Sequence, residues 1–329
     1  MAEQDDLTKT DCSVPQGLQG VRPHAAGPPE EIKIGLFVID IQKISDIEQT
    51  YDADFFMLVS WNDPRLSLAS LGRSLKDCRI LFDHIWHPLF LDANSTQGQL
   101  KLKPIVEIDD EGNVIYRQRY VGELKTDLHF REFPYDSQVL HFTIMTYGPD
   151  AEHINFVLDE KIMGMFESLS IEGWSITLGQ PVISKQYIAS ANKEIARIDF
   201  QILADRHPGF YLWMVIVPLC LIALMAWTVF WIDPSQTGPQ IGLSTATIFT
   251  LIAYRFSLGF TLPKISYFTR VDTFVLFATV LVFATLGVAI ATSRIAISGN
   301  KQLALRIEDW AKVIYLVIFI LLIFFTLIP

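Results

Sequence analysis

The stretch GFYLWMVIVPLCLIALMAWTVFWI, residues Gly209–Ile232, contains no charged side chain. It is longer than the roughly 20 apolar residues that cross the hydrocarbon core of a bilayer. Two further uncharged stretches follow it, Thr273–Ser293 and Val313–Pro329. The chain is therefore expected to be an integral membrane protein, which excludes the class of soluble enzymes.

Charge divides the 329-residue chain into two parts. Residues 1–205 hold 18 Lys and Arg against 32 Asp and Glu, net −14, whereas residues 206–329 hold 8 against 4, net +4, which together give the formal net charge of −10. A nucleic-acid-binding protein needs a basic face. The acidic water-soluble part therefore predicts no nucleic-acid partner.

The N-terminal part has the pattern of a β protein. Short apolar runs are broken about every eight to twelve residues by Gly, Pro, Asn or Asp, which is typical of a sandwich or barrel. We expect a mobile leader over 1–29 and an all-β, immunoglobulin-like sandwich over 30–205. No basic and apolar signal segment is visible at the N-terminus, so a native signal peptide cannot be read. The expected strands include Ile32–Ile41, Phe55–Trp61, Val114–Val121, Val139–Thr146, Trp174–Leu178 and Ile195–Leu203.

Residues 206–329 are expected to form a transmembrane domain of four helices, at about 208–232, 241–261, 271–293 and 311–328. The second is unusual, because its uncharged run Ile241–Tyr254 is short, rich in Ser and Thr, and followed by Arg255. A helix that is wet on one side and packed on the other has this composition. A hairpin that enters only half of the bilayer is the alternative. Basic residues weakly favour 294–310 as a cytoplasmic loop.

Several short motifs occur in a definite order along the chain. The motifs are Trp61-Asn62-Asp63-Pro64-Arg65-Leu66, Trp86-His87-Pro88, Phe133-Pro134-Tyr135-Asp136 with Gln138, Arg206, Pro218, Ala253-Tyr254-Arg255-Phe256 and Leu262-Pro263. In that order and spacing they resemble the pentameric ligand-gated ion channels of the Cys-loop receptor superfamily, especially its short bacterial members, over about residues 31–329. The cysteine pair of the eukaryotic members would fall at Thr126 and Leu140, and the linker between the third and fourth spans is short.

The resemblance implies a homopentameric ligand-gated ion channel in the inner cell membrane, with the N-terminal domain extracellular or periplasmic. Its partners would be further copies of the chain, membrane lipid, permeating monovalent cations and an agonist, either a small amine or a proton. No cofactor or metal is implied, and no catalytic constellation is visible in the sequence, so an enzyme is not expected. The alternative is a membrane-tethered sensing or binding protein that does not conduct.

The resemblance also implies a coupling junction. The loop at Phe133-Pro134-Tyr135-Asp136 would dock onto the membrane domain, with Asp136 facing Arg206. Pro263 and Lys264, in the loop after the second helix, would receive the movement. Trp61, Asp63 and Arg65, by contrast, are expected to determine the fold, since alternation along a strand would put all three on one face.

The ligand site of the resembling family is walled by aromatic rings that attract a cation through their π-faces. Phe56, Tyr147 and Tyr187 fall at such positions, but Ala93 stands where many members carry a tyrosine. Tyr147 as simple core packing is the alternative. His129, His141 and His207 invite a pH-sensing interpretation, although a histidine in a strand is more often just a satisfied or exposed residue.

Two stripes of the second helix compete for the pore. Gapless alignment backwards from Pro263 gives Gly242, Ala246, Phe249, Ala253, Phe256 and Phe260. Polarity alone gives Ser244, Thr247, Thr250, Tyr254 and Ser257, roughly 100° away on a helix. We follow the alignment, which predicts a hydrophobic constriction of Phe249 rings that closes by dewetting.

Selectivity depends on the charges at the two ends of the pore. Gly238-Pro239-Gln240 replaces the Pro-Ala-Arg run of anion-selective members, and the glutamate typical of cation-selective members is missing too. We predict cation selectivity, because the acidic domain should concentrate cations. Arg255 would oppose this if it faced the lumen.

Overall fold

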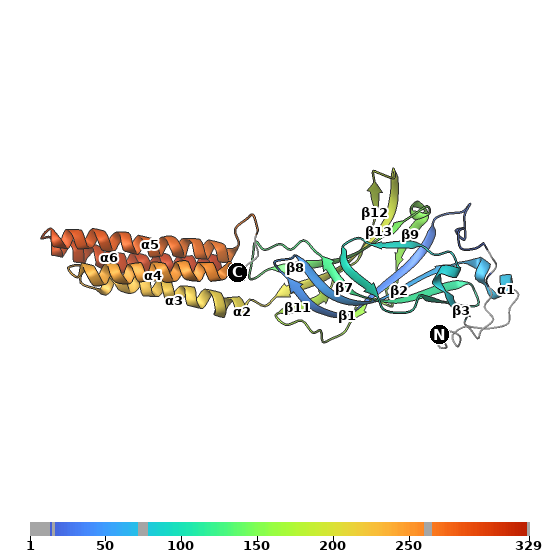
Figure 1. The fold of residues 1–329 in the computed structure, drawn as a ribbon, viewed down its shortest axis with the longest axis horizontal. Coiled ribbons are helices and arrows are strands. Elements are labelled where there is room, and N and C mark those ends of the chain that lie inside the picture. The colour runs from blue at the N-terminus through green and yellow to red at the C-terminus, as the bar shows by residue number, and fades with distance from the viewer. Residues whose placement is uncertain (1–13, 15–16, 72–77, 260–264, 328–329) are drawn as a thin grey trace. The chain divides into compact units, whose positions relative to one another are not determined.

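The computed structural model describes residues 14, 17–71, 78–259 and 265–327. The chain forms two compact units. The first contains residues up to 128 together with 139–172 and 176–204, and it holds the β-strands (Figure 1). The second contains the chain from residue 205 onwards and two short segments, 129–138 and 173–175. The second unit holds the long helices.

Two sheets make up the first unit. The larger has eight strands in the order β10-β1-β2-β7-β6-β3, with β5 paired to β7 and β9 paired to β1; the smaller has five, β11-β13-β8-β4, with β12 paired to β13. The strands are β1 Glu30–Ser45, β2 Thr50–Asn62, β3 Cys78–Leu81, β4 Leu89–Asp92, β5 Ser95–Leu100, β6 Ile105–Ile108, β7 Asn113–Lys125, β8 Ser137–Tyr147, β9 Ile154–Leu158, β10 Gly164–Met165, β11 Trp174–Leu178, β12 Val182–Ile188 and β13 Lys193–Arg206.

Period-two alternation sets which face of each strand is buried. In β1, Ile32, Ile34, Leu36 and Val38 are fully buried, whereas Lys33 between them is exposed and Phe37 is half-buried. A one-residue slip would turn this whole set outwards, so the alternation fixes the register. The β2–β7 pair runs without interruption from Thr50↔Lys125 to Asn62↔Asn113.

Aromatic side chains join the two sheets into a sandwich. Phe55 of β2 packs against Phe142 of β8 with 4.9 Å between ring centroids, and Tyr120 of β7 lies 5.1 Å from the same ring. Phe200 of β13 also stacks on Phe142, with 6.4 Å between ring centroids. Inward-facing rings of both sheets therefore form one core, as a β-sandwich requires.

The Trp61–Leu66 motif does not lie wholly on a strand, which corrects our expectation for Asp63 and Arg65. Strand β2 ends at Asn62, and Asp63 caps the 3₁₀-helix η1 Pro64–Leu66 by accepting a hydrogen bond from the Arg65 amide. The fully buried Asp63 carboxylate then holds the Arg65 guanidinium at 2.8 Å. Because Pro64 cannot donate to a sheet ladder, the chain turns here and the acid–base pair closes the turn.

Four helices of the second unit are long and apolar enough to cross a membrane: Gly209–Trp231, Thr237–Leu258, Arg270–Ile297 and Lys301–Leu327. The first consists of α2 Gly209–Tyr211, the π-helical η4 Leu212–Ile216, α3 Val217–Thr228 and the 3₁₀-helical η5 Val229–Trp231. The others are α4, α5 and α6, which pack side by side with α3 (Figure 1).

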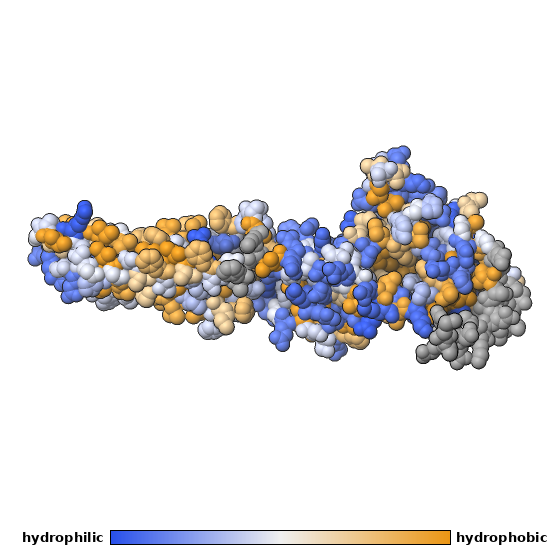
Figure 2. All heavy atoms as spheres, viewed as in Figure 1, coloured by the Kyte–Doolittle hydropathy of each residue, from blue (hydrophilic) through white to orange (hydrophobic). Residues whose placement is uncertain are grey.

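Local sequence explains where these helices begin. A capping box of Thr269 and Asp272 starts α5, as this pair of residue types does at three-residue spacing. The short, polar stretch around 241–254 forms one continuous helix of 22 residues, α4, and not a hairpin. The fourth helix begins at Lys301, well before the position near 311 that we expected. Hydrophobic residues cover much of the visible surface of these helices (Figure 2).

Candidate functional site

A buried ion pair lies at the centre of the predicted coupling junction. Arg206 donates from Nε to Asp136 Oδ1 at 2.9 Å and from a terminal nitrogen to Oδ2 at 3.3 Å. The two side chains are only 4% and 1% exposed. Gln138 also donates to this carboxylate, and the Arg206 amide donates to the Asp136 carbonyl. The structure thus brings together the acid and the base that we expected to face each other.

Aromatic rings enclose the Arg206 guanidinium. Its central carbon lies 4.1 Å from the Trp174 ring centroid, 5.0 Å from that of Phe133 and 5.5 Å from that of Tyr211. A cation shielded from water in this way is held by the ring faces as well as by its carboxylate. Phe133 itself is fully buried and precedes a cis peptide bond to Pro134. The apolar loop tip is therefore packed inside the helical unit.

Two contacts tie the same loop to the segment before α5. The Tyr267 hydroxyl accepts a hydrogen bond from the Phe130 amide at 2.9 Å, and Arg270 Nε donates to Glu132 at 2.6 Å. The predicted coupling residues Pro263 and Lys264 lie outside the described residues. Tyr267 and Arg270, which our sequence analysis did not select, make the contacts that the structure shows there.

The three predicted ligand-site aromatics lie on two different sheets. Tyr147 ends β8 and Tyr187 lies on β12, both in the five-stranded sheet, and they are 49% and 54% exposed. Phe56 lies on β2 of the eight-stranded sheet and is half-buried. Exposure of Tyr147 contradicts the alternative that it is simple core packing. Tyr187 is held by a hydrogen bond from its hydroxyl to Asn192 at 2.8 Å.

A small cavity of about 140 Å³ opens beside Tyr147. Trp86 and Asp150 line it, and the Trp86 indole donates to the Asp150 carboxylate at 3.1 Å. His87 also lines it and stacks on Phe82 at 3.9 Å, and burial lowers the pKa of His87. The Trp86-His87-Pro88 motif was expected to mark the family only. In the fold it forms the wall next to the exposed Tyr147 ring.

Of the three histidines considered as pH sensors, His141 has the clearest electrostatic partner. Its Nδ1 lies 2.8 Å from Asp199 Oδ2, and Thr143 donates to the other oxygen at 2.8 Å. The hydrogen bond to Asp199 raises the pKa of His141. Burial would raise the pKa of Asp199, but hydrogen bonds from His141 and Thr143 outweigh it and lower that pKa. His207 instead contacts the Ser175 hydroxyl at 2.7 Å.

One side of α4 faces away from its own subunit. Phe249 and Phe256 are 68% and 74% exposed, and Gly242, Ala246 and Ala253 are exposed as well. These are the described members of the stripe given by the alignment; Phe260 lies outside the described residues.

The polar stripe of α4 behaves differently. Ser244 and Thr247 are buried against the other helices, and their hydroxyls donate to the carbonyls of Gln240 and Leu243. Tyr254 is half-buried and donates to the carbonyls of Met214 and Val215 at 3.0 and 2.8 Å. Ser244, Thr247 and Tyr254 therefore pack within the subunit, whereas Thr250 and Ser257 of the same stripe are exposed.

A buried polar cluster holds the first turn of α4. Gln240 is fully buried; its amide nitrogen donates to Glu308 of α6, and its amide oxygen accepts from Ser293 of α5 at 2.8 Å. Thr292 donates to the same Glu308 oxygen at 3.0 Å. Sequence analysis selected Gln240 only as part of the Gly238-Pro239-Gln240 run, and it missed this cluster because Gln240 and Glu308 are far apart in the chain.

Arg255 lines a cavity of about 500 Å³ between α4 and α5, together with Leu251, Phe256, Thr279 and Phe283. The side chain is exposed on the single subunit. Among the residues that the structure describes, no group of three or more His, Cys, Asp or Glu side chains is placed to hold a metal ion.

Comparison with known families agrees with this geometry. Residues 18–208 match the neurotransmitter-gated ion-channel ligand binding domain, and residues 215–326 match the neurotransmitter-gated ion-channel transmembrane region. The chain belongs to the neurotransmitter-gated ion-channel family. The predicted membership of the Cys-loop superfamily and the predicted fold class, a β-sandwich followed by four membrane helices, are therefore confirmed. The channel is a multi-pass membrane receptor and not an enzyme.

Two relatives show how widely the channel's architecture is shared. A proton-gated ion channel from Gloeobacter violaceus is 22% identical over 306 residues, which cover 93% of this chain and 85% of that protein. The γ-aminobutyric acid receptor subunit beta-4 of Gallus gallus is 24% identical over 273 residues, 81% of this chain and 55% of that subunit. As in the sequence analysis, Thr126 and Leu140 replace the family's cysteine pair in the channel.

Proposed function

We propose that the chain forms a homopentamer that conducts monovalent cations through a central pore lined by α4. The observation that carries the proposal is that one side of α4 is buried within the subunit and the other side is exposed. Ser244 and Thr247 are sealed inside the subunit, whereas Phe249 and Phe256 project from it. Large exposed rings on a helix whose other side is packed need a partner surface, lipid or a pore to cover them. One chain suffices for a closed ring because a heterologous interface repeats the same two faces around a cyclic axis.

Closure would occur at Phe249. Rings that meet around an axis make a constriction that excludes water without filling the lumen, and ions do not cross a dry constriction. Gly242 and Ala246 lie on the same face of α4 as Phe249, nearer to the start of the helix, and their side chains are small. The pore would therefore be wider between the start of α4 and the Phe249 ring. Phe256 would form a second aromatic level toward the other end.

Gating would run through the loop between β7 and β8. Phe133 and Asp136 of that loop are packed with Arg206, the last residue of β13, which leads directly into the first membrane helix. A displacement of the strands that carry the loop would therefore act on the start of that helix. Contacts of Phe130 and Glu132 with Tyr267 and Arg270 give the loop a second connection, to the start of α5.

Two classes of stimulus fit the β-sandwich. An amine would use the exposed rings of Tyr147 and Tyr187 on one subunit and Phe56 on the opposite sheet of its neighbour, through cation–π contacts. A proton would use His141, which is placed against Asp199. The relative from Gloeobacter violaceus is described as proton-gated, which makes pH the first stimulus to test. A pH series and a series of small amines under voltage clamp distinguish the two stimuli.

Cation selectivity is supported by the charge of the two parts of the chain. Five copies of a domain with net charge −14 would concentrate cations at the mouth of the pore, although at physiological salt the Debye length of about 8 Å confines the effect to ions already close to the surface. The measurement is the reversal potential in a salt gradient. A shift toward the chloride equilibrium potential would overturn this part of the proposal and implicate Arg255.

Localisation follows from the same reasoning. An acidic, folded β-domain and four membrane helices fit a protein of the inner cell membrane whose N-terminal domain lies outside the cytoplasm. Protease protection of the β-domain in oriented vesicles tests this orientation.

Reconstitution separates the channel from its non-conducting rival. Purified chain in liposomes should give a stimulus-dependent current. A protein that binds amines or responds to pH in its β-domain but carries no current at any voltage would be a tethered receptor. Crosslinking and native mass spectrometry on the same sample should give five subunits.

A further inference from the structure

A titratable side chain is buried at the foot of the second unit, where α4 begins. Glu308 of α6 is 2% exposed; its Oε1 accepts a hydrogen bond from the Gln240 amide and lies 3.0 Å from the Thr292 hydroxyl. Three helices therefore meet at this carboxyl group, because Gln240 belongs to α4 and Thr292 to α5. The coupling junction contacts Arg270 at the other end of α5, about 33 Å away along that helix. Glu308 thus lies at the end of the unit that is far from the junction.

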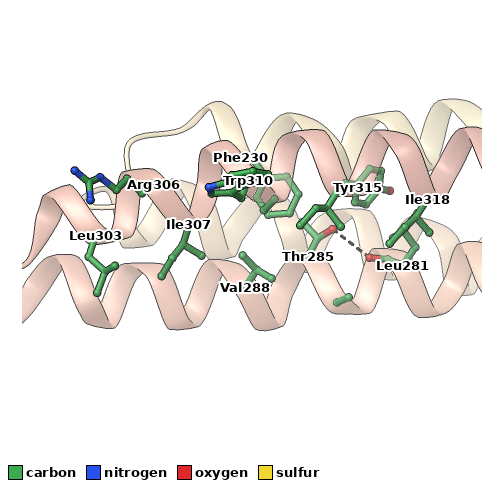
Figure 3. A pocket seen from close by; sticks show the side chains of 13 residues that line it. Phe230, Leu281, Thr285, Val288, Leu303, Arg306, Ile307, Trp310, Tyr315 and Ile318 are labelled. Carbon is green, nitrogen blue, oxygen red and sulfur yellow. Dashed lines mark hydrogen bonds between the residues drawn. The ribbon is translucent and has the colours of Figure 1, made fainter.

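The basic residues of α6 that are nearest to Glu308 in sequence do not neutralise it. Lys312 pairs with Asp309 at 2.8 Å. Arg306 lies with Trp310 in the groove between α5 and α6 (Figure 3), about 200° around the helix from Glu308. Among the described residues, Glu308 forms no ion pair. Its carboxyl group is therefore buried among neutral hydrogen-bonding partners.

The charged groups on the neighbouring elements are engaged or exposed. In the turn before α4, Asp233 pairs with Lys301 at 2.7 Å, and the two side chains are 39% and 50% exposed. On α5, Arg294 follows the buried Ser293 but is itself exposed. From α4 the side chain that reaches Glu308 is the neutral amide of Gln240. Water at the exposed Lys301 is only about 10 Å from Glu308 along α6, a short distance for a proton to travel.

The hydroxyl of Thr292 allows both protonation states of Glu308. It lies 3.0 Å from Glu308 Oε1 and also 3.0 Å from the Val288 carbonyl. A hydroxyl has one proton to donate and can accept at the same time. It donates to Glu308 when the acid is ionised; when the acid carries a proton, it can accept from Glu308 and donate to Val288. An ionised carboxylate buried without a cation is costly, so the neutral form fits this place best.

Hydrogen bonds continue from Glu308 into the first turns of α4. Gln240 is fully buried, and its amide oxygen accepts from Ser293 of α5 at 2.8 Å. Its backbone carbonyl accepts from Ser244, one turn further along α4, at 2.9 Å. Loss of a proton from Glu308 would place an uncompensated charge at the end of this chain. Water or a cation could relieve that charge only if the foot of α4 separated from α6.

We propose that Glu308 is a proton-binding site through which pH on the side of the membrane opposite the β-domain controls the packing of the first turn of α4. The bound proton keeps α4, α5 and α6 together at this end, and its release to water loosens the first turn. The site is separate from His141, which lies in the β-domain. The proton site stands on the buried geometry of Glu308, whereas its link to conduction rests on the proposed channel function.

Infrared spectroscopy of the purified full-length protein tests the proton site without a current. A protonated carboxyl group absorbs apart from carboxylates, and at about pH 6 an exposed glutamate, with its ordinary pKa of about 4.3, is ionised. Wild-type protein should show a protonated-carboxyl band at that pH, and E308Q should lose it. Q240L keeps the acid but removes a donor to it, so the band should persist at a shifted frequency; this assigns the band even if E308Q folds poorly. The exposed neighbour gives the matched control, D309N, which should leave the band unchanged. Absence of a band that depends on Glu308 would overturn the proton site.

Excised membrane patches test the link to the pore, because the solution on either side can be exchanged in turn. Raising the pH on the side opposite the β-domain should raise the resting current of the wild type roughly threefold per pH unit, below the limit of about tenfold for one released proton. E308Q should lose this response and D309N should keep it. An equal response in E308Q would overturn the link to α4. If no patch carries current while the infrared band depends on Glu308, the proton site is supported and the proposed channel function is overturned.

Discussion

The predicted coupling junction and the exposed side of α4 are two contrasting surfaces of the same helical unit. At the junction, Arg206 and Gln138 both donate to Asp136, and three aromatic rings surround the Arg206 guanidinium. On α4, the side chains of Phe249 and Phe256 are exposed in the single subunit. The first surface is complete in one chain, and the second makes physical sense only when other copies or a lumen meet it. Substitutions at the junction should therefore lower the free energy of unfolding and weaken the coupling. Substitutions at Phe249 should leave the subunit folded and alter conduction.

The largest effect is expected from separating the buried ion pair. Asp136→Ala or Arg206→Gln alone should destabilise the protein by about 3–5 kcal/mol, since each leaves an unpaired charge in a buried place. The double variant should cost clearly less than the sum of the two single variants. A double-mutant cycle on thermal unfolding and on the activation curve measures this coupling.

Additive effects in that cycle would show that the pair does not act as a unit. Asp205→Asn, next to Arg206 but outside the pair, is the matched control and should change stability by no more than about 0.5 kcal/mol.

The next largest effect concerns the foot of α4. Glu308→Ala should cost about 1–3 kcal/mol, because the donors of Gln240 and Thr292 lose their shared acceptor in a buried place. Asp309→Ala, one residue further on but exposed, serves as the control. Chemical denaturation in detergent gives the change in the free energy of unfolding for both variants. Equal changes would mean that the buried cluster contributes no more to stability than the exposed Asp309 does.

Removing the aromatic constriction should change conduction and spare folding. Phe249→Ala should raise the resting leak about tenfold, a shift of about 1.4 kcal/mol toward the conducting state, because a wider and wetter pore is less costly. Leak in unstimulated liposomes measures it, with thermal unfolding as a check on the fold. An unchanged leak in Phe249→Ala beside a clear effect of Thr250→Ala would assign the pore to the polar stripe.

The smallest expected effect is pH-dependent. The raised pKa of His141 contributes stability that is full below its ordinary value of 6.5 and lost as pH rises through the raised pKa. The lowered pKa of Asp199 contributes stability above its ordinary value of 3.8 that is lost as pH falls through the lowered pKa. His141→Gln should therefore lower the unfolding temperature at pH 5 to 6 by a few degrees and by less at pH 9.

His153→Gln, in the 3₁₀-helix η3 Ala151–His153, controls for loss of an imidazole. An equal change at both pH values would show that the ion pair with Asp199 carries no stability. If protons are the agonist, the same variant should also shift the activation pH.

Sequence analysis reached the parts of the channel that follow local rules. Alternation in β1, the uncharged run at Gly209–Ile232 and the motif at Phe133–Asp136 each report their structure within a few neighbouring residues. Asp63 and Arg65 were placed on a strand because alternation alone does not see the turn that Pro64 imposes. The early start of α6 was missed because the charges between Lys301 and Lys312 hide a helix whose Glu308 is buried.

Sequence analysis missed the pairings between residues far apart in the chain for a different reason. His141 meets Asp199, and Gln240 meets Glu308, only after the sheets and helices have packed. The periodicity of the sequence does not predict such contacts. The side of α4 that packs against its own subunit likewise depends on the positions of the neighbouring helices. The described residues of the aligned stripe are all exposed, whereas the polar stripe has both buried and exposed members.

The short π-helical segment η4 has a mechanical consequence. Tyr254 of α4 hydrogen-bonds the carbonyls of Met214 and Val215 inside that segment, and Gln240 is held at the other end of the same helix. About 21 Å separates these two points along the axis. A helix held near both ends can still move in two ways. It can rotate about the line through the two attachment points, and it can bend between them. Phe249 sits between the two points, where a bow has its greatest amplitude, so a small curvature of α4 moves that ring further than any sliding of the helix that both contacts allow.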